Sequence, residues 1–95
     1  MQHYVLLFSW TIVGVENVKD TIKRERAFTQ LVEKNGGKLL HFLYTMGQYD
    51  GVAILDFPND ESVMKVILKT ESLGNAKTQI LKGFTPTEIA KVLPP

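Results

Sequence analysis

The segment KLLHFLYTMGQYDGVAILDF, residues 38–57, decides the fold of this chain. It contains two apolar runs, 38–46 and 52–57, which are separated by the segment GQYDG at 47–51. Two glycines and an aspartate within five residues are typical of a tight turn. The segment therefore predicts a β-hairpin in the middle of the chain.

A strand and a helix are predicted before the hairpin. The strand spans 3–12, is apolar at nearly every position, and is broken by Gly14. The helix spans 21–34, and the glycines of NGG at 35–37 end it. The first half of the chain therefore has the order strand, helix, strand.

A second helix and a fourth strand are predicted after the hairpin. Asn59 or Asp60 is the expected N-cap of a helix over 61–73, and a strand follows at 76–84. The segment TPTE at 85–88 fits a capping box with proline at the first helical position. We therefore expect a short helix at the C-terminal end of the chain.

The predicted order βαββαβ, followed by a helix, is the ferredoxin-like arrangement of α+β domains. In this arrangement the first and third strands form the centre of a four-stranded antiparallel sheet. The two most apolar predicted strands, 3–12 and 52–57, are the first and third, whereas lysines lie in the second and fourth, as expected of edge strands. We expect one domain over 1–95, since this length suits a single core.

The uncovered face of this sheet predicts a homo-oligomer. Both helices lie on one side of the sheet, because crossover connections are right-handed. The first strand is largely apolar on both faces, and we expect the face from Tyr4 to Trp10 to meet the helices. Packing two open faces together removes the exposed apolar surface. The alternative is a monomer whose C-terminal helix folds over the open face.

Composition and charge exclude several classes of function. The net charge of +1 is far from the basic excess of a dedicated nucleic-acid binder. The chain has no cysteine, which excludes disulfides, thiolate metal sites and cysteine nucleophiles. It has no apolar run near the roughly 20 residues of a membrane span, and its N-terminus lacks the positive start of a signal peptide. We expect a cytoplasmic protein that binds neither nucleic acid nor membrane.

Several polar and aromatic residues are predicted to meet at one pole of the domain. The end of the first strand, the start of the first helix, the 47–51 turn and the end of the second helix all reach this pole. The candidate binding residues there are Trp10, Thr11, Arg24, Tyr49, Asp50 and Asn75, beside Gly74. We therefore expect the functional site of the domain at this pole.

Arg24 is the most informative candidate, because its helical angle places it on the apolar face with Ala27 and Phe28. A charge on that face needs a partner. Asp50 across the pole is one candidate partner, and Asp20 one turn earlier is another. Two interpretations follow: a structural salt bridge that joins turn and helix, or an anion-binding arginine that Asp50 holds in place.

The turn residues also allow two interpretations. Tyr49 and Asp50 are either a proton donor and base in a pocket, or structural residues. In the structural interpretation Asp50 accepts hydrogen bonds from backbone amides and Tyr49 packs at the rim of the core. Gly47 and Gly51 are expected only to permit the geometry of the turn.

Histidines and further aromatic residues complete the candidates. His3 and His41 are the only histidines, and no metal-ligand spacing relates them. If both point to the open face, His41 lines the space between two paired sheets; haem binding there is the minor alternative to a partly exposed or interfacial histidine. Trp10 and Tyr44 are candidates for stacking a flat aromatic ligand, against a role in the core or an interface. No cofactor and no bound metal are predicted.

Four segments together resemble the GYD domain family, which takes its name from a Gly-x-Tyr-Asp turn. They are YVLLFSWT at 4–11, GGK at 36–38, TMGQYD at 45–50 and SLGN at 72–75, and the resemblance covers about residues 3 to 92. The family is similar to the dimeric α/β-barrel superfamily, whose members pair their sheets into a barrel. The resemblance implies a homodimer or larger homo-oligomer. It implies no particular activity, because that superfamily includes monooxygenases, isomerases, haem proteins and ligand-sensing domains.

Three hypotheses of function follow. The first is a homo-oligomeric small-molecule binding or sensing module. The second is a small cofactor-free monooxygenase or isomerase that uses Tyr49, Asp50 and Arg24, or a cavity lined by His41. The third is a structural or interaction protein whose open sheet meets a different partner. A ligand-sized cavity separates the first two hypotheses from the third, and an acid or base inside it separates the enzyme from the binding module.

Overall fold

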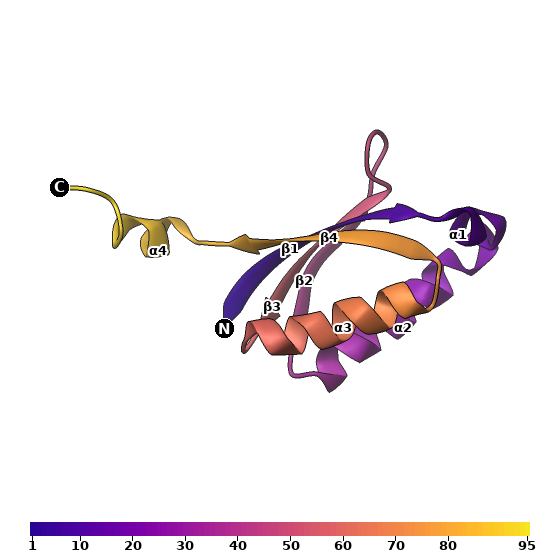
Figure 1. The fold of residues 1–95 in the computed structure, drawn as a ribbon, viewed down its shortest axis with the longest axis horizontal. Coiled ribbons are helices and arrows are strands. Elements are labelled where there is room, and N and C mark those ends of the chain that lie inside the picture. The colour runs from indigo at the N-terminus through magenta and orange to yellow at the C-terminus, as the bar shows by residue number, and fades with distance from the viewer.

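The chain folds into a four-stranded antiparallel sheet with two long helices on one face, in a computed structural model that describes residues 1–95 (Figure 1). Strands β1, β2, β3 and β4 span Gln2–Trp10, Lys38–Tyr44, Gly51–Phe57 and Ala76–Gly83. Helices α1, α2, α3 and α4 span Ile12–Glu16, Thr21–Lys34, Asp60–Ser72 and Pro86–Ala90, and a 3₁₀ turn, η1, covers Val18–Asp20. The strand order β2-β3-β1-β4 confirms the predicted ferredoxin-like α+β arrangement.

The two most apolar strands, β1 and β3, lie side by side at the centre of the sheet, as predicted. β1 pairs antiparallel with both neighbours, so that Leu6 lies opposite Ala53 of β3 and Ile80 of β4. Tyr4, Leu6 and Phe8 are all buried beneath the helices. This burial confirms that the face from Tyr4 to Trp10 is the one that meets the helices.

A hydrophobic core fills the space between the sheet and helices α2 and α3. β3 contributes alternate residues, and each helix contributes one stripe of residues three or four positions apart. The fully or almost fully buried members from these elements are Ala53, Leu55, Phe57, Phe28, Val32, Val63, Val66 and Ile67. Burial of these side chains is the main stabilising term for the domain, since it removes apolar surface from water.

The structure differs from the prediction between β1 and α2. β1 ends at Trp10 rather than at Ile12, and α1 follows at once. Thr11 is the N-cap of this helix, because its Oγ1 accepts a hydrogen bond from Gly14 N at 3.1 Å. The same hydroxyl group donates to Gly74 O at 2.6 Å. The predicted end at Ile12 is wrong because this β-forming side chain is 79% exposed and lies on a surface helix.

The hairpin forms as predicted, with two differences in detail. β2 ends at Tyr44, and Met46 is fully exposed in the turn that follows. A bulge at Leu40 shifts the register of β2 against β3. After the bulge Phe42 packs against the core, whereas His41 lies on the opposite face of the sheet.

The predicted caps of the last two helices form. Asn59 Oδ1 accepts a hydrogen bond from Ser62 N at 2.8 Å at the start of α3. In α4, Glu88 N donates to Thr85 Oγ1 at 3.1 Å and Thr85 N donates to Glu88 Oε1 at 2.8 Å, which completes the capping box. These bonds satisfy backbone groups that the first helical turn leaves free.

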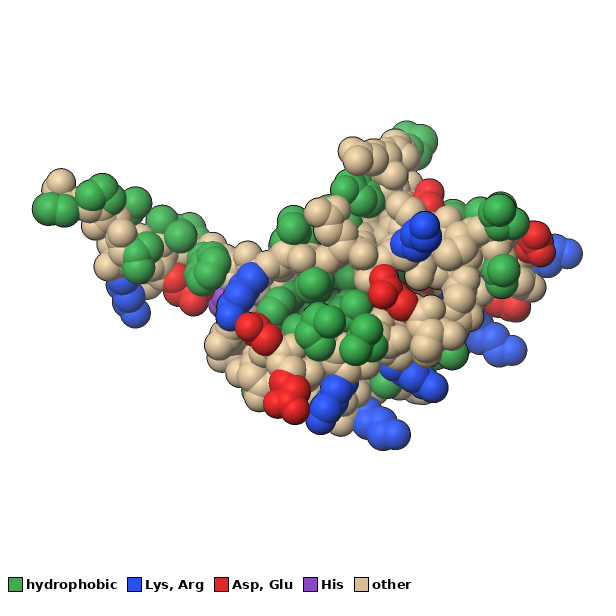
Figure 2. Space-filling view, in the orientation of Figure 1, with side chains coloured by type: hydrophobic (Ala, Val, Ile, Leu, Met, Phe, Trp, Pro, Cys, Tyr) green, Lys and Arg blue, Asp and Glu red, His purple; other side chains and the backbone are tan.

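The C-terminal helix does not cover the open face of the sheet. The C-terminal arm, residues 84–95, extends away from the body of the molecule, and the whole chain with the arm measures 53 × 30 × 18 Å (Figure 1). Hydrophobic side chains are visible along this arm in Figure 2, and Val92 is 75% exposed. The alternative in which this helix folds over its own sheet is therefore not what the structure shows.

Tyr4 links the core to the start of α3 through its hydroxyl group. The hydroxyl donates a hydrogen bond to Asp60 Oδ1, and Lys82 Nζ lies 3.1 Å from the same oxygen. The bond from Tyr4, followed by the bond from Lys82, lowers the pKa of Asp60. Burial, followed by the bond to Asp60, raises the pKa of Tyr4 to about 12.

Replacing Tyr4 by phenylalanine tests this link. Because the pKa of Asp60 is lowered in the folded state, its charge stabilises the fold above its ordinary pKa of 3.8, and this contribution is lost as the pH falls through the lowered value. We expect Tyr4→Phe to lower the midpoint of urea unfolding at neutral pH, and the difference from the parent protein to shrink below pH 3.8. Tyr49→Phe is the control, since the Tyr49 hydroxyl bonds the uncharged Gln79. The link is absent if both variants show the same pH dependence.

Candidate functional site

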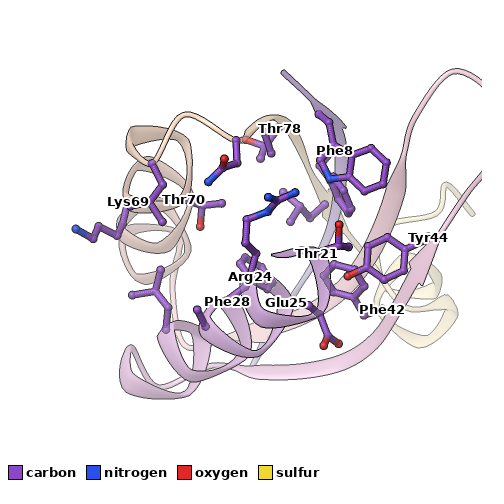
Figure 3. A pocket seen from close by; sticks show the side chains of 17 residues that line it. Phe8, Thr21, Arg24, Glu25, Phe28, Phe42, Tyr44, Lys69, Thr70 and Thr78 are labelled. Atoms are coloured by element: carbon purple, nitrogen blue, oxygen red, sulfur yellow. The ribbon is translucent and has the colours of Figure 1, made fainter. Parts of the chain in front are cut away.

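A cavity of about 290 Å³ lies between the sheet and the helices, at the pole where β1 ends (Figure 3). The second halves of β1 and β2, most of α2, the end of α3 with the loop that follows it, and the start of β4 all contribute to its lining. Hydrophobic residues make up 10 of the 17 that line it. The cavity is therefore mainly apolar, and it lies at the pole where the sequence predicts a site.

Four aromatic side chains from β1 and β2 form one wall of the cavity. Phe8 and Trp10 are two positions apart in β1, as are Phe42 and Tyr44 in β2, so all four point to the helix side of the sheet. The ring centroids of Phe42 and Tyr44 are 5.2 Å apart, and those of Trp10 and Tyr44 are 6.3 Å apart. Ring contacts at these distances are favourable, so the wall is formed before any ligand arrives.

Gly51 supports this wall from the backbone of β3. A Cβ atom added at Gly51 would lie 2.1 Å from Phe8 Cε1, so only glycine lets the Phe8 ring pack here. The prediction that Gly51 serves only the geometry of the turn is therefore wrong. Gly47, in contrast, has a φ of +115°, which a side chain rarely allows and a turn glycine adopts without strain.

Arg24 is the charged side chain that points into the cavity. Glu25 and Lys69 also contribute to the lining, but their charged groups point away from its centre (Figure 3). Arg24 Nη1 donates to Asn17 O at 2.7 Å, and Nη2 donates to Gly14 O at 3.2 Å. The guanidinium group is therefore held by two backbone carbonyl groups.

Asp50 does not pair with Arg24, so the predicted salt bridge between turn and helix is wrong. Asp50 Oδ2 instead accepts a hydrogen bond from Trp10 N at 2.8 Å, and Asp50 N donates to Phe8 O at 2.8 Å. Asp20 forms no ion pair with Arg24 either. The reason is that two backbone carbonyl groups, from α1 and from the residue after it, bind the guanidinium group in place of an acidic partner. α1 is an element that the sequence did not predict.

Tyr49 and Asp50 do not form an acid–base pair in the cavity. The Tyr49 hydroxyl donates to Gln79 Oε1 at 2.8 Å. Gln79 lies opposite Leu7 in the sheet, on the face away from the helices. The two turn residues therefore have different partners, and neither lines the cavity.

Thr11 and Asn75 connect α1 to the loop after α3. Thr11 N donates a hydrogen bond to Asn75 O at 3.1 Å. A Cβ atom added at Gly14 would lie 2.1 Å from the same carbonyl oxygen, so α1 packs directly on this loop. Asn75 lines the cavity, whereas Thr11 lies outside it and positions α1.

His3 and His41 lie on the open face of the sheet, outside the cavity. His3 Nδ1 is 2.6 Å from Asp56 Oδ1, and His3 Nε2 is 3.6 Å from Glu88 Oε1. His41 is exposed and lies opposite Ile54. No group of three or more His, Cys, Asp or Glu side chains is arranged to hold a metal ion. Neither histidine is therefore part of the site at the pole.

The hydroxyl group of Tyr44 is a hydrogen-bond donor at the rim of the cavity. Burial raises the pKa of Tyr44, the charge of Glu25 adds to this rise, and the charge of Arg24 opposes it. The hydroxyl therefore stays protonated at neutral pH. Arg24, Glu25 and Tyr44 all belong to the lining of the cavity.

Half of the predicted candidates line the cavity, and Thr11 and Asp50 lie next to it, bonded to lining residues. Trp10, Arg24, Tyr44 and Asn75 line the cavity, and Thr11, His41, Tyr49 and Asp50 do not. The prediction omitted Phe8 and Phe42, which belong to the aromatic wall. The alternation of strand side chains is the signal that finds them, because Phe8 shares a face with Trp10 and Phe42 shares one with Tyr44.

Fold and cavity together define a class of protein: a ferredoxin-like α+β domain with an apolar cavity between its sheet and its helices. The family model of the GYD domain matches residues 4–93 of the 95. The chain therefore belongs to the GYD domain family, as its four segments predict. No curated protein matches the sequence. None of the helices has the length and hydropathy that a membrane crossing requires.

A double-mutant cycle tests the separation of Arg24 from Asp50. We expect Asp50→Ala to lower the free energy of unfolding by about 1–3 kcal/mol, because Trp10 N loses its acceptor. The effects of Asp50→Ala and Arg24→Gln should add to within about 0.5 kcal/mol, since the two residues share no partner. Urea denaturation of the single and double variants gives these values. A coupling free energy above about 1 kcal/mol would instead show that the two side chains interact.

Proposed function

We propose that this protein is a small-molecule binding or sensing module that works as a homo-oligomeric α/β barrel. The preformed, mainly apolar cavity at the pole carries the proposal, since small-molecule sites are concave, apolar and equipped with a few polar groups. A buried cavity of about 150 Å³ is large enough for benzene. A cavity of about 290 Å³ therefore suits a ligand of one or two rings.

The geometry favours binding over catalysis. An enzyme of the monooxygenase or isomerase type needs an acid or base that touches the reacting atoms. The predicted pair, Tyr49 and Asp50, lies outside the cavity, and His41 lies on the other face of the sheet. Binding needs only the aromatic wall and the polar groups that line the cavity, and it calls for no metal or cofactor.

Binding of an uncharged fluorescent probe tests the proposal. We expect the fluorescent two-ring compound 1-naphthylamine to bind with a Kd in the micromolar range, and Ala27→Phe to weaken this binding about tenfold or more. Ala27 lines the cavity from α2, so a phenyl group there occupies part of the space. Gln30→Phe adds a phenyl ring to an exposed position of the same helix, away from the cavity, and it should leave the Kd unchanged. Equal effects of the two variants would place the probe elsewhere.

The assembly is proposed from the open face of the sheet. Val5, Leu7, Val52 and Ile54 lie at its centre and are only half-buried in one chain. Leu43 of β2 extends this apolar surface and is 61% exposed. At roughly 25 cal/mol per Å², burying about 500 Å² of apolar surface would supply about 12 kcal/mol before the costs of association. A second copy offers an open face of the same kind.

Light scattering after size-exclusion chromatography tests the assembly. We expect a mass of at least twice the 10.7 kDa of one chain at micromolar concentration. Val52→Lys should reduce the mass to that of one chain, because Val52 lies opposite Leu7 at the centre of the open face. Gln30→Lys, on the exposed side of α2, is the control and should leave the mass unchanged. A parent protein that elutes as a strict monomer contradicts the proposed assembly.

A further inference from the structure

We infer that the cavity at the pole takes a ring-containing apolar molecule with a single anionic group, and that Arg24 binds this anion. The inference rests on the proposed binding function and adds the chemical class of the ligand. It follows from three features of the cavity: the unpaired charge of Arg24, the way the guanidinium group is held, and the apolar character of the remaining lining.

The charge of Arg24 has no acidic partner. The close contacts between basic and acidic side chains join His3 to Asp56 and Glu88, and Lys82 to Asp60, so none of them involves Arg24. Arg24 donates only to the carbonyl oxygens of Asn17 and Gly14, which are uncharged. A guanidinium group has five N–H donors, so three are left for a ligand. A positive charge beside apolar side chains favours an anion, because the anion offsets the loss of water around the charge.

The guanidinium group is held in place before a ligand binds. Its two acceptors belong to α1 and to the residue that follows it. α1 is itself fixed at the pole, because Gly14 packs on the carbonyl oxygen of Asn75 and Thr11 bonds the loop after α3. Binding therefore loses little side-chain entropy at Arg24, whose side chain points into the cavity (Figure 3).

The rest of the lining defines the body of the ligand. The aromatic wall offers ring faces and edges to a flat molecule. Lys69 points its amino group away from the cavity, so only one cation faces the ligand (Figure 3). Glu25 also belongs to the lining, and its carboxylate disfavours a second negative charge on the ligand. A monoanion with one or two rings fits this arrangement, and a dianion or a sugar does not.

A matched pair of probes tests the inference. 1-Naphthylamine is uncharged at neutral pH, and 5-aminonaphthalene-1-sulfonate is the same two-ring system with one sulfonate. The measured quantity is the ratio of the two Kd values, which cancels effects on the shape of the cavity. We expect Arg24→Gln to raise the Kd of the anionic probe about tenfold relative to the Kd of the uncharged probe. The Kd of the uncharged probe itself should change less than twofold. Arg26→Gln, on the exposed side of α2, removes the same charge outside the cavity and should leave the ratio unchanged.

The outcomes show whether the binding function, the role of Arg24, or both are wrong. If the uncharged probe binds in an Ala27-dependent manner but Arg24→Gln leaves the ratio unchanged, the binding function stands and the assigned role of Arg24 is wrong. If Arg26→Gln changes the ratio as much as Arg24→Gln does, the anion responds only to overall charge, and the inference is again overturned. If neither probe binds, both proposals fail. Should Arg24→Gln not fold, Arg24→Lys is measured instead, and the loss of the planar fork should still weaken the anionic probe about threefold or more.

Discussion

The structure depends on the burial of a pair of central strands that are apolar on both faces. β1 and β3 have one face in the core, where alternate residues such as Leu6 and Leu55 are buried under α2 and α3. Their other face carries Val5 and Ile54 and receives no cover from the C-terminal arm. A sheet of this kind gains stability from one layer of helices, and its second face stays exposed in the single chain. This one constraint accounts for both the fold and the proposed assembly.

The turn that gives the family its name supports the cavity without lining it. Asp50 accepts a hydrogen bond from the backbone of Trp10, and Gly51 lets the ring of Phe8 pack on the backbone. Tyr49 reaches the other face of the sheet, where it bonds Gln79. The turn therefore positions the end of β1, and the end of β1 supplies half of the aromatic wall. These contacts give the aspartate and the second glycine of the turn a role in positioning β1.

The site combines a rigid apolar wall with one directed charge. Rings from β1 and β2 contact one another, and Arg24 is held by carbonyl groups near α1 rather than by a carboxylate. An acidic partner would neutralise the guanidinium group within the protein, whereas a carbonyl partner orients it and leaves its charge available. This difference is the basis of the anion-binding role that we propose for Arg24.

The sequence by itself determined the order of the elements, the central place of β1 and β3, and the caps of α3 and α4. These features follow from local periodicity and from short-range hydrogen bonds, such as the one from Ser62 N to Asn59, which any sequence with this pattern forms. Only the tertiary structure decided the partner of Arg24, the existence of α1 and the lining of the cavity. These features depend on contacts between residues far apart in the chain, such as Gly14 with Asn75 and Phe8 with Gly51, and the distance between such residues is a property of the folded chain alone.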